Sequence, residues 1–173
     1  MSISVMKNYI QVVTTDYPAA EILDNIIFNI SLNSTKLSSS SATIPEVYGH
    51  TWGKLDEQVA RKYPKAFTRV IAADTLWMDW EHHNLAKSIL HFLSDSPSAR
   101  GIVVAGLHSG RQKMSKFWDA AVEEGLAVES IRERDVDGVE RPYMAGRGTE
   151  DVVERKRWLI IGTLRKKFLP HET

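Results

Sequence analysis

Short apolar runs alternate with helical patterns along this chain, and this alternation limits the folds that it can adopt. The runs are rich in β-branched residues, and between them apolar side chains recur every three to four residues. Strands that alternate with helices of about 10–15 residues indicate an α/β fold, with a mostly parallel sheet and helices on both faces. The sequence predicts strands over 10–15, 44–48, 68–73, 101–107, 126–132 and 158–164, and helices over 18–30, 81–93 and 113–124.

The predicted strands differ in character. We expect 10–15, 68–73 and 101–107 to be inner strands, because they are dense in β-branched residues. Residues 126–132 alternate apolar and polar side chains, as an edge or antiparallel strand does, and 158–164 is expected to be antiparallel. The Ser/Thr-rich segment 33–43 and the Gly-rich, charged segment 136–149 are predicted loops, the first of them flexible.

Composition excludes several classes of protein. The 173 residues fit a single domain, residues 1–173, and 22 basic residues balance 22 acidic ones, so no overall basic field favours nucleic acid or a membrane surface. The absence of cysteine excludes disulfides and thiolate metal sites. No run of about 18 apolar residues or signal-peptide pattern occurs, so we expect a cytoplasmic or nuclear protein.

Ligands of parallel α/β sheets bind at the carboxyl ends of the strands, where three clusters of this sequence lie. The first ends in Asp16, directly before a helical pattern that opens at Pro18. A carboxylate in this place can accept hydrogen bonds from two ribose hydroxyls. It can equally cap the following helix, and the spacing alone leaves both interpretations open.

The second cluster is YGHTWG, in which glycines flank Trp52. A flat aromatic side chain at a strand end can stack on an adenine, or it can close the rim of the core. The third cluster runs from Ala72 to Trp77, where two small residues let a planar group approach the strand. Asp74 can orient an incoming amine and Trp77 can wall the reacting centre; the alternative is a capping Asp followed by a core Trp.

The histidines give weaker signals. His82, His83 and His91 lack zinc-ligand spacing, so no metal site is predicted. His108 and Arg111, in LHSGR, lie at another strand end and can bind an anion or cap the next helix. Serine-nucleophile and P-loop patterns are absent.

Taken together, these clusters resemble the class I S-adenosylmethionine-dependent methyltransferases, in the branch of the nicotinamide N-methyltransferase-like and protein-lysine methyltransferases. The resemblance extends from about residue 9 to 167, over VVTTDYP, YGHTWG, VIAADTLWMDWEHHNL, LHSGRQKMSKFWDAAVEEGL and ERKRWLIIGTL. It implies a Rossmann-like seven-strand fold, S-adenosylmethionine as cofactor, and a protein lysine or a small amine as methyl acceptor.

The resemblance also implies roles for individual residues. Asp16 matches the acid that binds the cofactor ribose, Trp52 the aromatic beside the adenine, and Ala73 the small residue that lines the same pocket. Asp74 and Trp77 match the acidic-x-x-aromatic segment at the substrate entrance, where Asp74 would orient the acceptor amine. The related protein-lysine enzymes usually carry Tyr or Phe where this chain has Trp77, a departure that would reshape the channel.

The first strand and glycine-rich turn of the family have no counterpart in the residues before Asp16. We therefore expect an N-terminally incomplete methyltransferase domain with two exposed strand edges, self-association through these edges, and cofactor binding no tighter than about millimolar. Two alternatives are a non-catalytic remnant or partial gene product that serves as a binding module, and a different nucleotide-binding Rossmann protein.

Overall fold

A computed structural model describes residues 11–34 and 44–167 of the chain. The chain divides into two compact units, residues 1–51 and 52–173. Each unit has its own sheet and is described by itself. The single domain predicted from the length of the chain stays a prediction.

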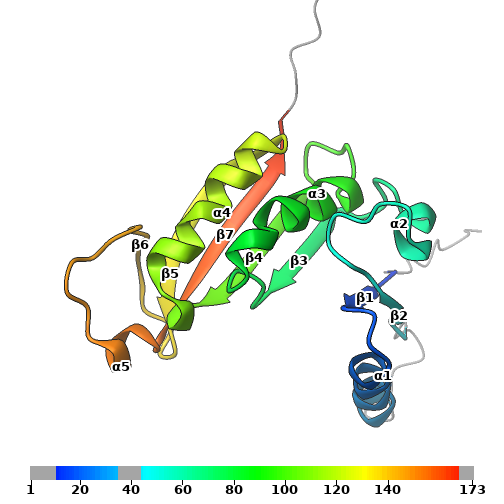
Figure 1. Ribbon diagram of the computed structural model, residues 1–173, viewed down its shortest axis with the longest axis horizontal. Coiled ribbons are helices and arrows are strands. Elements are labelled where there is room, and N and C mark those ends of the chain that lie inside the picture. Colours follow the sequence, from blue (N-terminus) through cyan, green and yellow to red (C-terminus); the bar gives the residue numbers. More distant parts are fainter. Residues whose placement is uncertain (1–10, 35–43, 168–173) are drawn as a thin grey trace, which may run out of the picture. The chain divides into compact units, whose positions relative to one another are not determined.

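The first unit is a strand–helix–strand segment, drawn in blue to cyan in Figure 1. Strands β1 (Val13–Asp16) and β2 (Glu46–Gly49) pair in parallel, with Asp16 opposite Gly49, and α1 (Ala20–Ser34) follows β1. The predicted strands and helix are therefore confirmed with shifted bounds. Helix α1 takes in the first two residues of the predicted loop, and 35–43 lie outside the described residues.

The second unit contains a five-stranded sheet in the order β3-β4-β7-β5-β6. Its strands are β3 (Arg69–Ala73), β4 (Arg100–Gly106), β5 (Leu126–Asp135), β6 (Glu140–Pro142) and β7 (Trp158–Lys166). Its helices are α2 (Gln58–Lys62), α3 (His82–Phe92), α4 (Arg111–Glu123) and α5 (Val152–Arg155), with single turns η1 (Asp79–Glu81) and η2 (Leu107–Ser109).

The sheet corrects the prediction of one mostly parallel, seven-stranded sheet. Only β3 and β4 pair in parallel within it, whereas β7 runs antiparallel to both β4 and β5, and β6 is antiparallel to β5. The reason is the connection from β5 to β7: it starts and ends at the same edge, where Asp135 lies opposite Trp158, so the chain reverses direction. The antiparallel C-terminal strand was predicted and is confirmed.

Two further predictions about the sheet were wrong. Residues 69–73 of the predicted strand 68–73 form β3, but β3 is the edge of the described five-stranded sheet rather than an inner strand, and its Ile71 side chain is exposed. Strand β6 lies inside the predicted loop 136–149, because this short, charged strand has no apolar pattern that could reveal it. Among the described residues, β1 pairs only with β2, and β3 only with β4; the exposed edges of an incomplete domain stay a prediction.

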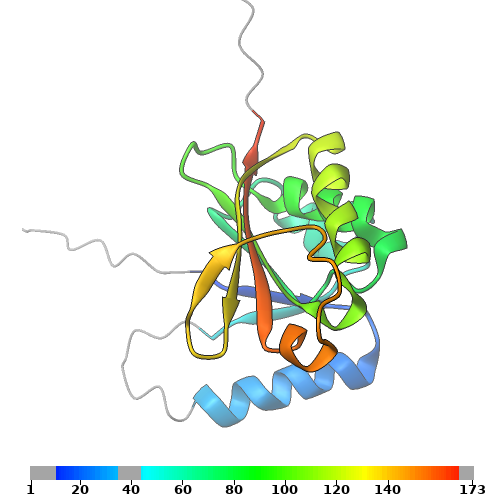
Figure 2. The same ribbon diagram turned by 90° about the vertical axis from the view of Figure 1, so that its left-hand side faces the viewer.

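The core of the second unit lies between the sheet and helices α3 and α4. Figures 1 and 2 show α3 and α4 on the same face of this sheet. Val103, Ile160 and Leu164 point to this face and are fully buried, while Leu159, on the other face, is exposed. Side chains alternate in this way because successive strand residues point to opposite faces.

Candidate active site

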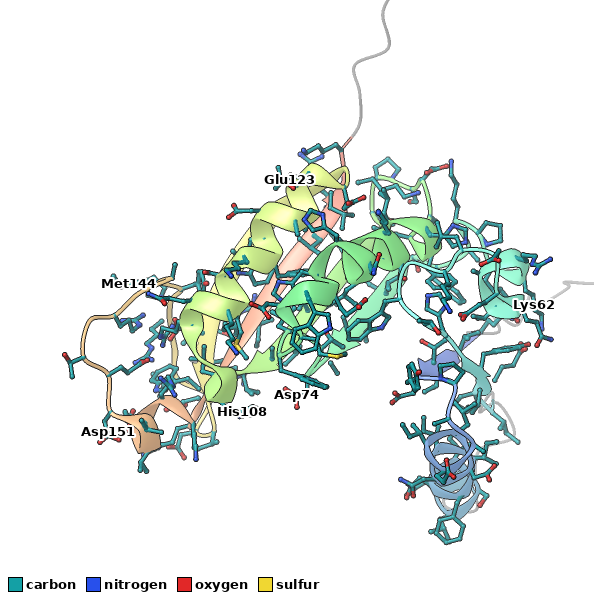
Figure 3. All side chains as sticks on the ribbon, in the orientation of Figure 1. Lys62, Asp74, His108, Glu123, Met144 and Asp151 are labelled. Atoms are coloured by element: carbon teal, nitrogen blue, oxygen red, sulfur yellow. The ribbon has the colours of Figure 1, made fainter. Side chains whose placement is uncertain are left out.

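The carboxyl ends of β3 and β4 meet at one edge of the sheet, because these two strands are parallel neighbours. Ala73, the last residue of β3, lies opposite Val104 and is exposed. Asp74 follows β3, and His108 follows β4 within η2. Figure 3 shows the labelled Asp74 and His108 side chains beside each other at this edge. The sequence predicted Asp74 as a site residue but did not pair it with His108.

The backbone of Asp74 fixes where its carboxylate projects. Its φ of 54° lies in the left-handed region, which Asp and Asn tolerate better than most residues. The Asp74 N–H donates a hydrogen bond of 2.7 Å to the Val104 carbonyl, so this conformation is anchored to β4. The side chain is 66% exposed, which leaves the carboxylate open to a ligand. Asp74 therefore ends the strand and presents its charge to solvent.

His108 lies over Gly106. A Cβ added at Gly106 would come within 2.2 Å of His108 Cε1, so in this position the imidazole fills the space that a side chain at residue 106 would take. From this place His108 Nε2 lies 3.4 Å from Asp74 Oδ1, and the His108 side chain is 54% exposed. An Asp–His pair with both members open to solvent can bind and exchange protons with an amine.

Two tryptophans follow Asp74 in the chain. Trp77 is 49% exposed, so the interpretation of Trp77 as a core side chain is wrong. The prediction that Trp77 walls the reacting centre stays a prediction. Trp80, in η1, is exposed as well and was missed by the sequence reasoning. Lys116 on α4 lies 3.5 Å from Asp79, which links the η1 turn to α4.

Trp52 belongs to the second unit and is half-buried against its hydrophobic core. The residue after it, Gly53, has a φ of 79°, and its N–H donates a hydrogen bond of 2.9 Å to Ser88 Oγ. This packing agrees with the interpretation as a side chain at the rim of the core. The stacking of Trp52 on an adenine stays a prediction.

Asp16 lies in the first unit, at the carboxyl end of β1. Its Oδ1 accepts a hydrogen bond of 2.7 Å from the Tyr17 N–H, whereas α1 begins only at Ala20. The side chain thus stabilises the turn after the strand instead of capping the helix. Asp16 is exposed, and its role with a ribose stays a prediction.

Arg111 is part of a buried ion network, so of the two interpretations left open for His108 and Arg111, the binding of an anion by Arg111 is not favoured. Its side chain is 6% exposed and that of Glu133 is fully buried, with Arg111 Nη2 donating to Glu133 Oε2 at 2.9 Å. Glu150 accepts two further hydrogen bonds of 2.8 Å from Arg111. Arg141 Nε donates to Glu133 at 2.7 Å, and its guanidinium lies 3.5 Å from the centroid of the Trp158 ring.

This network holds the segment between β5 and α5 against the start of α4. Burial, the largest influence on Glu133, raises its pKa, but hydrogen bonds from Arg111 and Arg141 outweigh it and leave the pKa below its usual value. Hydrogen bonds from Arg111 likewise lower the pKa of Glu150. The positive charge and the N–H donors of Arg111 are therefore engaged within the fold.

The three histidines considered for a metal site lie in different surroundings. His82 is buried, with Nε2 3.0 Å from the Leu76 carbonyl, and burial lowers its pKa. His83 pairs with Glu124 at 2.9 Å, and His91 Nε2 lies 2.8 Å from the Ala60 carbonyl. Residues 11–34 and 44–167 contain no group of three or more His, Cys, Asp or Glu that could hold a metal ion. Likewise, no helix within these ranges is long and apolar enough to cross a membrane.

The chain is similar in sequence to fungal proteins named protein N-terminal and lysine N-methyltransferase. The efm7 protein of Aspergillus fumigatus is 30% identical over 142 residues, which cover 79% of this chain and 54% of that protein. The Eremothecium gossypii protein is 30% identical over 130 residues, covering 71% and 48%, and the Schizosaccharomyces pombe protein 28% over 130 residues, covering 70% and 48%. The chain thus spans about half the length of the curated relatives that it matches.

The chain is thus similar in sequence to methyltransferases over about half of their length. Its fold agrees with this. A chain of the complex between the Haloferax volcanii Trm112 methyltransferase activator and its candidate methyltransferase has a TM-score of 0.57 at 13% identity, over 94% of this chain and 74% of that chain. A Pyrococcus horikoshii protein has a TM-score of 0.53 at 13% identity, over 91% and 72%. No protein-family model matches the chain.

These likenesses support a Rossmann-like fold, as the sequence predicted. What the sequence could not predict is which charged groups the fold leaves exposed. The Asp74–His108 pair joins residues from two strand ends, and the Arg111 network joins α4, β5 and the segment before α5. A signal for the first pair was nevertheless present, because Gly106 stands two residues before His108 at the end of an apolar run.

Proposed function

We propose that this chain is an S-adenosylmethionine-dependent methyltransferase that modifies a protein amine, either a lysine side chain or an amino terminus. The similarity to protein N-terminal and lysine N-methyltransferases carries this proposal. The exposed Asp74 carboxylate agrees with it, because a positively charged amine is the group that a carboxylate at a strand end attracts. We also propose that the chain belongs to the branch of methyltransferases that includes the nicotinamide N-methyltransferase-like proteins.

The proposal assigns Asp16, Trp52 and Ala73 to the nucleoside of the cofactor, and each is described within its own unit. The Asp16 carboxylate uses one hydrogen-bonding position for Tyr17 N–H, and about three lone-pair positions are left for ribose hydroxyls. Ala73 is small and exposed, and Trp52 offers an aromatic ring. When bound, S-adenosylmethionine supplies an electrophilic methyl group. The protein's task is then to bind the amine, orient it, and help it to lose a proton.

Asp74 has the orienting role in this proposal. Its carboxylate would accept hydrogen bonds from the acceptor amine and hold the nitrogen in line with the methyl group. Orientation of this kind can contribute about 7–11 kcal/mol to lowering a barrier. Trp77, three residues later, would exclude water from one side of the amine, which favours the neutral form that can react.

Methyl transfer to peptides tests the proposal. The chain would be incubated with about 1 mM S-adenosylmethionine, to allow for weak binding, and with peptides that contain either a lysine or a free amino terminus. We expect the mass of the peptide to rise by one or more methyl groups. Unmodified peptides in the presence of a folded chain would contradict the proposed function.

Cofactor binding tests the Asp16 and Trp52 assignments separately. Asp16→Ala should weaken the binding of S-adenosylmethionine roughly 10–100-fold, through the loss of charge-assisted hydrogen bonds. Trp52→Ala should lose about 1–3 kcal/mol of stacking. Calorimetry in which both variants bind as the parent does would show that the cofactor lies elsewhere.

A further inference from the structure

We propose that His108 accepts the proton of the methyl-acceptor amine, that Asp74 holds the imidazole for this task, and that the pair serves polypeptide amino termini better than lysine side chains. This inference rests on the proposed function and adds a residue and a substrate preference to it.

The hydrogen-bonding arrangement leaves one imidazole nitrogen for a substrate. His108 Nε2 faces Asp74 Oδ1 at 3.4 Å, so Nε2 is the nitrogen that donates to the carboxylate. In a neutral imidazole with its proton on Nε2, Nδ1 carries a lone pair and accepts. Both side chains are more than half exposed, so an amine can reach them from solvent.

Two features of the backbone place this pair independently of each other. Gly106 leaves the space that the imidazole fills, since any Cβ there would meet His108 Cε1 at 2.2 Å. Asp74 is held in the left-handed region, at a φ of 54°, by its hydrogen bond to the Val104 carbonyl.

The proposed step is the transfer of one proton from the acceptor amine to His108. The Nδ1 lone pair of His108 takes a proton from the acceptor's ammonium group, so that one N–H bond breaks and another forms. The products are a neutral amine with a free electron pair and an imidazolium whose positive charge lies beside the Asp74 carboxylate. The neutral amine is the nucleophile, and the imidazolium later returns its proton to water.

The substrate preference follows from how strongly each amine holds its proton. In reference peptides the pKa is about 6.5 for an imidazole, about 7.7–8.0 for an amino terminus and about 10.4 for lysine. An amino terminus thus has a pKa a little more than one unit above that of an imidazole, whereas the pKa of lysine is about four units above it. Moving a proton to the imidazole therefore costs much less free energy from an amino terminus than from lysine. An imidazole is therefore an effective proton acceptor for the first amine and a poor one for the second.

His83 provides a matched control. Its side chain is 53% exposed, close to the 54% of His108, and it too pairs with a carboxylate, that of Glu124 at 2.9 Å. It lies on α3, away from the ends of β3 and β4. His83 also lies 3.6 Å from Glu123. His83→Asn and His108→Asn thus each remove an exposed imidazole that contacts a carboxylate, and only His108 lies at the proposed site.

The main experiment compares the methylation of two peptides by the full chain and its two variants. One peptide has a free amino terminus and no lysine, and the other has an acetylated amino terminus and one lysine. We expect His108→Asn to lower kcat for the first peptide about 100-fold, with KM nearly unchanged, and to affect the second far less. His83→Asn should match the parent chain on both peptides.

A measurement without turnover tests the arrangement itself. In nitrogen-15 spectra of the imidazoles, neutral His108 should carry its proton on Nε2, and Asp74→Asn should alter this signal while that of His83 is unchanged. A proton on Nδ1, or equal losses with both peptides, would overturn the role of His108 while leaving the proposed function intact. If the parent chain methylates neither peptide, both the proposed function and this inference fall.

Discussion

His108 and Arg111 lie three residues apart in the LHSGR segment, but their side chains belong to two different clusters, one exposed and one buried. Arg111 points inward, where its side chain and that of Glu133 are 6% and 0% exposed. His108 and Asp74 point outward and are more than half exposed. A buried pair has fixed partners and a high cost of disruption, whereas an exposed pair adds little stability and is free to bind a ligand. The comparison separates what holds the fold from what is available for chemistry.

The largest effect should come from the buried cluster. Glu133→Gln removes the buried charge that faces Arg111 and Arg141, which leaves Glu150 as the one remaining carboxylate in the described network. We expect the free energy of unfolding to fall by about 3–5 kcal/mol, measured by urea denaturation. Glu129→Gln, also on β5, breaks an exposed pair with Arg100 and should change stability little. Equal effects of the two substitutions would contradict the distinction between buried and exposed pairs.

A second test compares two glycines that each lie under an aromatic ring. A Cβ at Gly162 would come within 2.2 Å of the buried Trp118 indole, so Gly162→Ala should cost about 1–3 kcal/mol of unfolding free energy. Gly106→Ala makes the same close approach to His108, which is exposed and can swing aside. Thermal unfolding should therefore show a loss for Gly162→Ala and almost none for Gly106→Ala; a larger loss for Gly106→Ala would mean that His108 is part of the core.

The dependence of stability on pH gives a smaller effect. Burial lowers the pKa of His82 below its usual 6.5, so the unfolded chain binds a proton there more readily than the folded chain. Stability from this residue is present above about pH 6.5 and is lost as the pH falls through the lowered value. The lowered pKa values of Glu133 and Glu150 add a second loss below their usual 4.5.

Urea denaturation between pH 7 and pH 5 separates these contributions. We expect the stability of the parent chain to decline over this interval, and that of His82→Asn to be lower throughout but to decline less. His83→Asn should keep the decline of the parent chain, because His83 is exposed. A steeper decline in His82→Asn would show that the sign of the His82 contribution is wrong.

The sequence predicted where the strands and helices lie better than it predicted which strands pair and in which direction. β-Branched runs revealed β1, β3, β4 and β7, since a strand's character is local. The edge position of β3 and the antiparallel direction of most pairs depend on contacts between distant segments, which no local pattern reports. Contacts between distant segments also decide the site residues. Asp74 could be identified from its place at a strand end. The burial of Arg111 could not be predicted, because its partners Glu133 and Glu150 lie 22 and 39 residues further along the chain.

Methyl transfer by Asp74→Asn tests most directly whether the exposed pair is the site of chemistry. Asparagine has nearly the same shape and tolerates the left-handed backbone at this position, so the unfolding midpoint should match that of the parent chain. The charge that orients the amine and supports His108 is lost, and we expect the rate on the amino-terminal peptide to fall at least about 10-fold. A folded Asp74→Asn chain that transfers methyl groups as fast as the parent would contradict the assignment of this strand edge as the active site.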